Sequence, residues 1–162
     1  MICHSDSSDQ DEVYKAKVRL ILSSVAVTFR LPIRCYLHPP NSTVKVDILF
    51  PALPPALDGI GDHTSHFARR LASYATVRVL TAQKDALPIP GVSIQRAFAT
   101  ASRSSINQVL NAVRTSPPDV LLVEFNQFSY GRWGLNPHLP WLLQSIKRHL
   151  PSIRIAWMAH ED

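Results

Sequence analysis

One unit of the sequence, residues 46–72, constrains the fold more than any other because it joins a strand to a helix within a short stretch. Residues 46–50 are mostly apolar and too few for a helix, and Pro51 cannot continue the hydrogen bonding of a strand. Residues 67–72 then repeat apolar side chains at helical spacing. A strand followed at once by a helix is the unit from which α/β folds are built.

Two glycines, Gly59 and Gly61, lie between this strand and its helix. We expect them to form a turn that uses positive φ and lets another molecule approach the backbone. Asp62 is predicted to cap the helix by accepting hydrogen bonds from N–H groups of its first turn. The N-terminus of a helix suits a phosphate or diphosphate, because it presents unpaired N–H donors and the positive end of the helix dipole. A purely structural tight turn is the alternative for these glycines.

The rest of the chain continues the alternation of strands and helices. Further strands are expected at residues 76–81, 92–96, 119–124 and 153–159, and further helices at residues 104–114 and 137–150. This pattern predicts an α/β fold with a Rossmann-like, doubly wound parallel sheet. Right-handed crossovers give the strand order 3-2-1-4-5, counted from residue 46. Residues 45–162 form this domain, and residues 1–44 are expected to be a poorly organised extension with a strand or two at most.

The composition is that of a globular protein. The 162 residues are 46% hydrophobic and 18% charged, which is enough apolar material for one packed domain. The net charge is +5, but the basic residues are spread over separate elements, so we expect no nucleic-acid partner. Cys3 and Cys35 form neither a disulfide framework nor a metal-binding pair, and this favours a cytoplasmic location.

In a doubly wound sheet, ligands bind outside the carboxyl ends of the strands, where the strand order reverses. Three parts of this sequence should reach that edge: residues 59–63, Glu124 at the end of a buried strand, and His160 after the last strand. We take Glu124 as a candidate substrate contact, with a helix cap or a salt bridge as the alternative. His160 is a candidate for acid or base chemistry.

Other motifs are incomplete. Thr64 stands where a dinucleotide-binding fingerprint needs its third glycine, and residues 80–83 lack the acidic side chain that would bind a ribose. An unrelated Rossmann-like oxidoreductase therefore stays only an alternative, and no Gly-Lys-Ser/Thr P-loop occurs. His63 and His66 are three residues apart, but no third ligand stands at a recognised spacing, so we expect no metal.

Taken together, these features resemble the amino-terminal domain of GT-B glycosyltransferases, specifically the family-4-like retaining enzymes. The matching parts are residues 51–55, 58–64, 67–72, 118–126, 130–131 and 159–161, so the resemblance runs from about residue 45 to the end. That family transfers a sugar, such as a hexose, from a nucleotide-diphosphate donor to an acceptor hydroxyl, which is in some members lipid-linked. Its members usually hold no metal, and we expect no cofactor here.

The resemblance implies a role for each matching residue. Gly59 and Gly61 would approach the diphosphate and the reacting sugar of the donor. His160 would contact the donor sugar near the reacting centre, which makes it the catalytic candidate. Asp62 and His63 would line the acceptor side of the cleft.

The sequence also departs from this family. GT-B enzymes have a second Rossmann-like domain that holds most of the nucleotide and carries two glutamates at fixed spacing, whereas this chain ends at Asp162. We therefore expect an incomplete glycosyltransferase with little or no transfer activity alone, and a separately encoded carboxy-terminal domain as its partner. Family members also suggest peripheral association with the inner membrane surface. The alternative is a non-catalytic module that binds an anion or a nucleotide and pairs with a separate partner domain.

Overall fold

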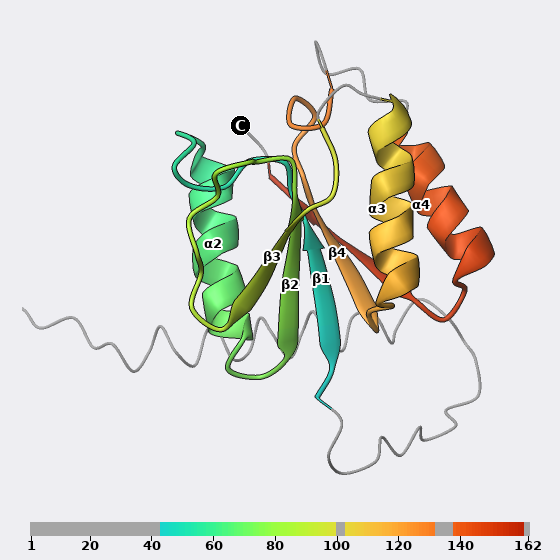
Figure 1. Cartoon of the computed structure of the whole chain (residues 1–162), viewed down its shortest axis with the longest axis horizontal. Coiled ribbons are helices and arrows are strands. Elements are labelled where there is room, and N and C mark those ends of the chain that lie inside the picture. Colours follow the sequence, from blue (N-terminus) through green and yellow to red (C-terminus); the bar gives the residue numbers. More distant parts are fainter. Residues whose placement is uncertain (1–42, 100–102, 132–137, 161–162) are drawn as a thin grey trace, which may run out of the picture. The chain divides into compact units, whose positions relative to one another are not determined.

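Apolar strand segments assemble into one parallel sheet in the computed structural model, which describes residues 43–99, 103–131 and 138–160 (Figure 1). The strands are β1 (Lys45–Leu49), β2 (Thr76–Thr81), β3 (Val92–Arg96), β4 (Val120–Phe125) and β5 (Arg154–Ala159). Each begins and ends within one residue of its predicted bounds. The strand or two expected in the N-terminal extension fall before residue 43, outside the described residues.

The strand order is β3-β2-β1-β4-β5, which confirms the predicted order. The fold is therefore α/β, with a Rossmann-like, doubly wound sheet. The order reverses between β1 and β4, because β2 lies on one side of β1 and β4 on the other. This reversal defines the crevice at the carboxyl edge where ligands bind in such folds.

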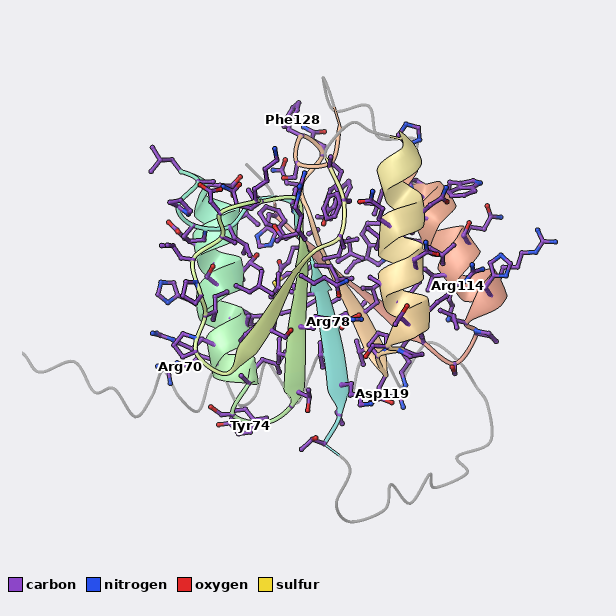
Figure 2. The ribbon with its side chains drawn as sticks, viewed as in Figure 1. Arg70, Tyr74, Arg78, Arg114, Asp119 and Phe128 are labelled. Carbon is purple, nitrogen blue, oxygen red and sulfur yellow. The ribbon has the colours of Figure 1, made fainter. Side chains whose placement is uncertain are left out.

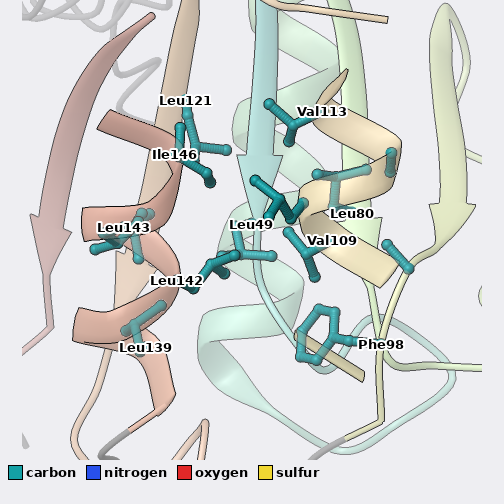
Figure 3. Close-up of a cluster of buried hydrophobic side chains, with 14 of the residues drawn as sticks. Leu49, Leu80, Phe98, Val109, Val113, Leu121, Leu139, Leu142, Leu143 and Ile146 are labelled. Atoms are coloured by element: carbon teal, nitrogen blue, oxygen red, sulfur yellow. The ribbon is translucent and has the colours of Figure 1, made fainter. Parts of the chain in front are cut away.

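Among the described residues, three helices cover the sheet, α2 (Gly59–Leu71), α3 (Arg103–Thr115) and α4 (His138–His149). Figure 1 shows α2 on one side of the sheet and both α3 and α4 on the other. The main hydrophobic core lies under α3 and α4 (Figure 3). It includes Leu49, Leu80 and Leu121 from the strands, Val109 and Val113 from α3, and Leu139, Leu142, Leu143 and Ile146 from α4. Each such buried side chain stabilises the fold by about 1.5–3 kcal/mol.

The start of α2 differs from the prediction. Asp58, not Asp62, is the N-cap: its Oδ1 accepts a hydrogen bond from the Gly61 N–H at 2.8 Å. Gly59 and Gly61 lie inside the first turn of the helix, so the predicted positive-φ turn is wrong. The reason is that glycine permits positive φ without requiring it, and Asp58 supplies a cap one turn earlier.

Gly61 instead allows close packing. A Cβ at this position would lie 2.9 Å from the carbonyl oxygen of Ala52, in the loop that follows β1. The absence of a side chain therefore lets that loop lie directly against the helix and brings α2 to the carboxyl edge of the sheet.

All described residues belong to one compact unit, Pro39–Asp162. None of the three helices that the structure describes is long and apolar enough to span a membrane.

Candidate functional site

Three polar side chains from distant parts of the sequence meet at the carboxyl edge of the sheet. They are His63 in α2, Glu124 near the end of β4, and His160 directly after β5. Each offers one nitrogen or oxygen atom, and these three atoms lie within 4.8 Å of one another. The sequence predicted that these residues share one edge, and the structure brings them into a single cluster.

The sheet register explains why Glu124 and His160 meet. Glu124 is paired with Met158, and the His160 N–H donates to the carbonyl oxygen of Phe125 at 2.9 Å. Side chains alternate between the faces of a sheet, so His160 points to the same face as Met158 and Glu124. This is also the face covered by α2, from which His63 approaches.

Glu124 and His160 form a short hydrogen bond. The Glu124 Oε2 lies 2.5 Å from the His160 Nε2, and the glutamate side chain is completely buried whereas that of His160 is 20% exposed. Burial raises the pKa of Glu124, and the hydrogen bond from His160 together with the charges of His160 and His63 opposes that rise. The two imidazoles therefore offset part of the cost of burying the Glu124 carboxylate.

His63 completes the cluster from the other side. Its ring stacks on Phe67 at 6.1 Å between centroids and meets the ring of His160 edge-on at 5.3 Å. Within the part of the chain that the structure describes, the buried His63 Nδ1 and Glu124 Oε1 have no hydrogen-bond partner. An unpaired buried polar atom costs about 1–3 kcal/mol, so both atoms indicate a position for a bound group.

Tyr130 supports the cluster from below. Its hydroxyl lies 2.6 Å from the carbonyl oxygen of Leu49 and 2.8 Å from that of Glu124, so it bridges the ends of β1 and β4. Burial, and secondly the charge of Glu124, raises the pKa of Tyr130 well above its usual 10, so the hydroxyl remains a donor. Tyr130 was not among the predicted site residues; its sequence signal is its place in residues 130–131, a loop that is part of the resemblance described above.

The other predicted site residues are placed differently. Gly59 is exposed, and the space where its Cβ would lie is open. The side chain of Asp62 is also exposed. The N–H of Gly61 is already bonded to Asp58, so it is not free for a diphosphate. The negative charge of the Asp58 carboxylate at this helix end also disfavours binding of an anion there.

His66, considered with His63 as a metal-binding pair, is exposed and lies outside the cluster. The expectation of no metal depended on the spacing of possible ligands along the sequence around His63 and His66. In the fold, the neighbours of His63 come from β4 and β5, which spacing in sequence does not reveal.

The strand order and the cluster at the carboxyl edge define a Rossmann-like protein with a candidate site at the edge where such folds bind ligands. Comparisons with protein families, curated proteins and solved structures find no match to this chain.

Proposed function

We propose that this chain is the acceptor-side, amino-terminal domain of a glycosyltransferase that uses a nucleotide-diphosphate sugar as donor and a hydroxyl group as acceptor. The observation that carries the proposal is the hydrogen-bonded pair of Glu124 and His160, beside His63, at the edge where β1 and β4 diverge. The position agrees with the sequence resemblance, which assigns the donor sugar to His160 and the acceptor side to His63.

In such a reaction Glu124 would orient the imidazole of His160. Glu124 is buried and fixed by its strand, so its hydrogen bond holds the imidazole of His160 in one orientation. A fixed imidazole at the edge of the crevice can bind a sugar hydroxyl and position the anomeric carbon. Transfer then breaks the bond from that carbon to the diphosphate oxygen and forms one to the acceptor oxygen, whose proton passes to the departing diphosphate.

His63 is suited to the acceptor. Its Nδ1 is buried and has no partner among the described residues, so it can form a hydrogen bond with an incoming hydroxyl. Gly59 leaves open space at the start of α2. Asp62 is exposed near the same turn.

The proposal includes a partner domain. In GT-B enzymes most of the nucleotide is held by the second domain, so this chain would act with such a domain, separately encoded or attached. The acceptors include lipid-linked ones, and the protein would then work in the cytoplasm or at the inner surface of the membrane.

Ligand-observed NMR on the full chain tests the proposal, with nucleotide-diphosphate sugars, free nucleoside diphosphates and NAD⁺ titrated separately in the presence of a chelator. We expect the sugar conjugates to bind more tightly than the free diphosphates. His160→Ala should weaken that binding by about tenfold, which corresponds to the loss of one good hydrogen bond. The matched control is His66→Ala, an exposed histidine one turn along α2, which should bind as the wild type does.

Two results would contradict the proposal. Tight binding of NAD⁺ without affinity for sugar conjugates would favour an oxidoreductase. Sustained glycosyl transfer by this chain alone would show that no partner domain is needed.

A second candidate function is a non-catalytic module that pairs with a partner domain through the same edge. The observation that favours it is the exposure of Leu57, Leu87 and Phe128, which lie in the loops that follow β1, β2 and β4. The carboxyl ends of parallel strands share one edge, so all three loops leave the sheet there, and Figure 2 shows Phe128 in the loop beyond β4. Nucleotide binding that ignores the sugar and survives His160→Ala would support this candidate.

A further inference from the structure

We infer that His63, Glu124 and His160 form a binding site for one divalent transition-metal ion, of which Zn²⁺ is the best-suited example. The inference goes beyond the proposed function and does not depend on it, because the resemblance to GT-B enzymes implies a centre without metal. It depends on the donor set, the geometry and the unpaired atoms of these three residues.

The donor set selects the class of ion. Two imidazole nitrogens and one carboxylate oxygen are the ligands of many zinc and iron sites, whereas Mg²⁺ and Ca²⁺ prefer oxygen ligands alone. A combination of two histidines and one glutamate therefore favours Zn²⁺ or a similar ion over Mg²⁺.

The geometry requires only small movements. Bonds of about 2.0–2.2 Å from a central ion to nitrogen and oxygen place ligand atoms roughly 3–4 Å apart. Here the three candidate atoms lie within 4.8 Å of one another, and side-chain rotations that open the 2.5 Å hydrogen bond between Glu124 and His160 can close the set around an ion.

The ligands come from rigid elements. Glu124 lies inside β4, and the backbone of His160 is bonded to Phe125 at the end of the same strand. His63 stacks on Phe67 within α2. Tyr130 holds the ends of β1 and β4 together directly below the cluster. Such support preorganises a metal site, because the side chains need little ordering when the ion binds.

The unpaired atoms favour a positive group at this position. Glu124 is 0% exposed, and its Oε1 has no partner in the described part of the chain. The buried His63 Nδ1 is likewise unpaired there. A buried carboxylate is costly unless it is paired or coordinates a metal, and one ion at this position could engage both atoms.

Three protein ligands leave at least one coordination position open. That arrangement is typical of catalytic zinc sites, in which water or a substrate oxygen takes the fourth position, whereas structural zinc sites have four protein ligands. The bound ion would therefore have a position for water or a substrate oxygen.

The test uses the full chain after removal of metal by a chelator, titrated with Zn²⁺, Co²⁺ and Mg²⁺ in separate experiments. We expect one equivalent of Zn²⁺ to bind and Mg²⁺ to bind far more weakly. The Co²⁺ complex should show a visible spectrum of nitrogen and oxygen ligation, without the sulfur-to-cobalt charge-transfer absorption that Cys3 or Cys35 would produce.

Single substitutions test whether these three residues bind the ion. His63→Ala, Glu124→Gln and His160→Ala should each lower the Zn²⁺ affinity by about 100-fold or more, since loss of a mere supporting residue already costs 10–100-fold. His66→Ala is the matched control, one turn along the same helix and exposed, and should bind Zn²⁺ as the wild type does. Circular dichroism checks folding, and His63→Ala gives the decisive comparison if either change at the buried pair prevents folding.

Three results would overturn the inference. They are Zn²⁺ binding no tighter than Mg²⁺ binding, Zn²⁺ binding that His63→Ala leaves unchanged, and a thiolate signal in the Co²⁺ spectrum. The sugar titration described above is performed with chelator present, so failure of the metal site and failure of the proposed function are distinguished.

Discussion

Asp47 is a buried carboxylate in the middle of the sheet and is not part of the candidate site. It lies opposite Arg78 on the neighbouring strand, whose Nε and Nη2 donate to the two carboxylate oxygens at 2.9 and 2.5 Å. Burial raises the pKa of Asp47 above its ordinary 3.8, and the hydrogen bonds and charge of Arg78 only partly oppose this. The carboxylate of Asp47 therefore loses more by burial than it gains from Arg78.

The raised pKa predicts a direction of pH dependence. The folded state holds the Asp47 proton more tightly than the unfolded chain does, so this group contributes less stability as the pH rises from 3.8 through its folded pKa. Asp47→Asn lacks the ionisation and keeps the shape. We expect this variant to gain stability relative to the wild type over that pH range, by about 1.4 kcal/mol for every tenfold difference in proton affinity between the folded and unfolded chains.

Urea unfolding of both proteins at a series of pH values measures this difference. If the free energy of unfolding of the wild type instead rose relative to that of Asp47→Asn with rising pH, the pair with Arg78 would outweigh the burial of the carboxylate.

At the scale of elements, Gly59 and Gly61 in the first turn of α2 differ in how much space a side chain would have. A Cβ on Gly61 would lie 2.9 Å from the backbone oxygen of Ala52, whereas a Cβ on Gly59 would have nothing within 4 Å. Gly61→Ala should therefore lower the free energy of unfolding by about 1–3 kcal/mol through overpacking. Gly59→Ala should leave it unchanged or raise it by up to about 1 kcal/mol, because alanine loses less backbone entropy on folding.

Thermal and urea unfolding of the two variants provide the measurement, and each variant is the control for the other. Equal effects would show that the contact between Ala52 and α2 does not govern the start of the helix.

The strands and their order could be predicted because their signals are local or general. β1, β4 and β5 are short, mostly apolar runs bounded by prolines or polar residues, and right-handed crossovers leave few possible orders. The start of α2 could not be predicted in this way. Asp58 and Asp62 are both suitable caps by residue type, and the choice between them depends on how closely the loop at Ala52 packs, which is a tertiary contact.

The candidate site was predicted in position but not in detail. Parallel strands guarantee that Glu124 and His160 reach the same edge. Their hydrogen bond depends on the register between β4 and β5, and the approach of His63 depends on the exact start of α2. Tyr130 was missed because its partners are backbone carbonyl groups, which have no signature in the sequence.

At the scale of the whole molecule, the net charge of +5 needs an explanation that does not depend on a nucleic acid. Basic residues occupy the last turn of each described helix: Arg69 and Arg70 in α2, Arg114 in α3, and Lys147, Arg148 and His149 in α4. A positive charge at the C-terminus of a helix stabilises it by about 0.3–1 kcal/mol. Figure 2 shows Arg70 and Arg114 on opposite sides of the sheet.

This distribution predicts weak binding of nucleic acid despite the positive charge. A protein that binds a nucleic-acid duplex tightly needs several cations on one face to displace counterions. Here the helices that carry these cations lie on both sides of the sheet. Titration of a labelled duplex of about 20 base pairs at about 150 mM salt should give a dissociation constant no tighter than about 10 µM, within the range of non-specific binding. Submicromolar binding with a steep salt dependence would contradict this expectation.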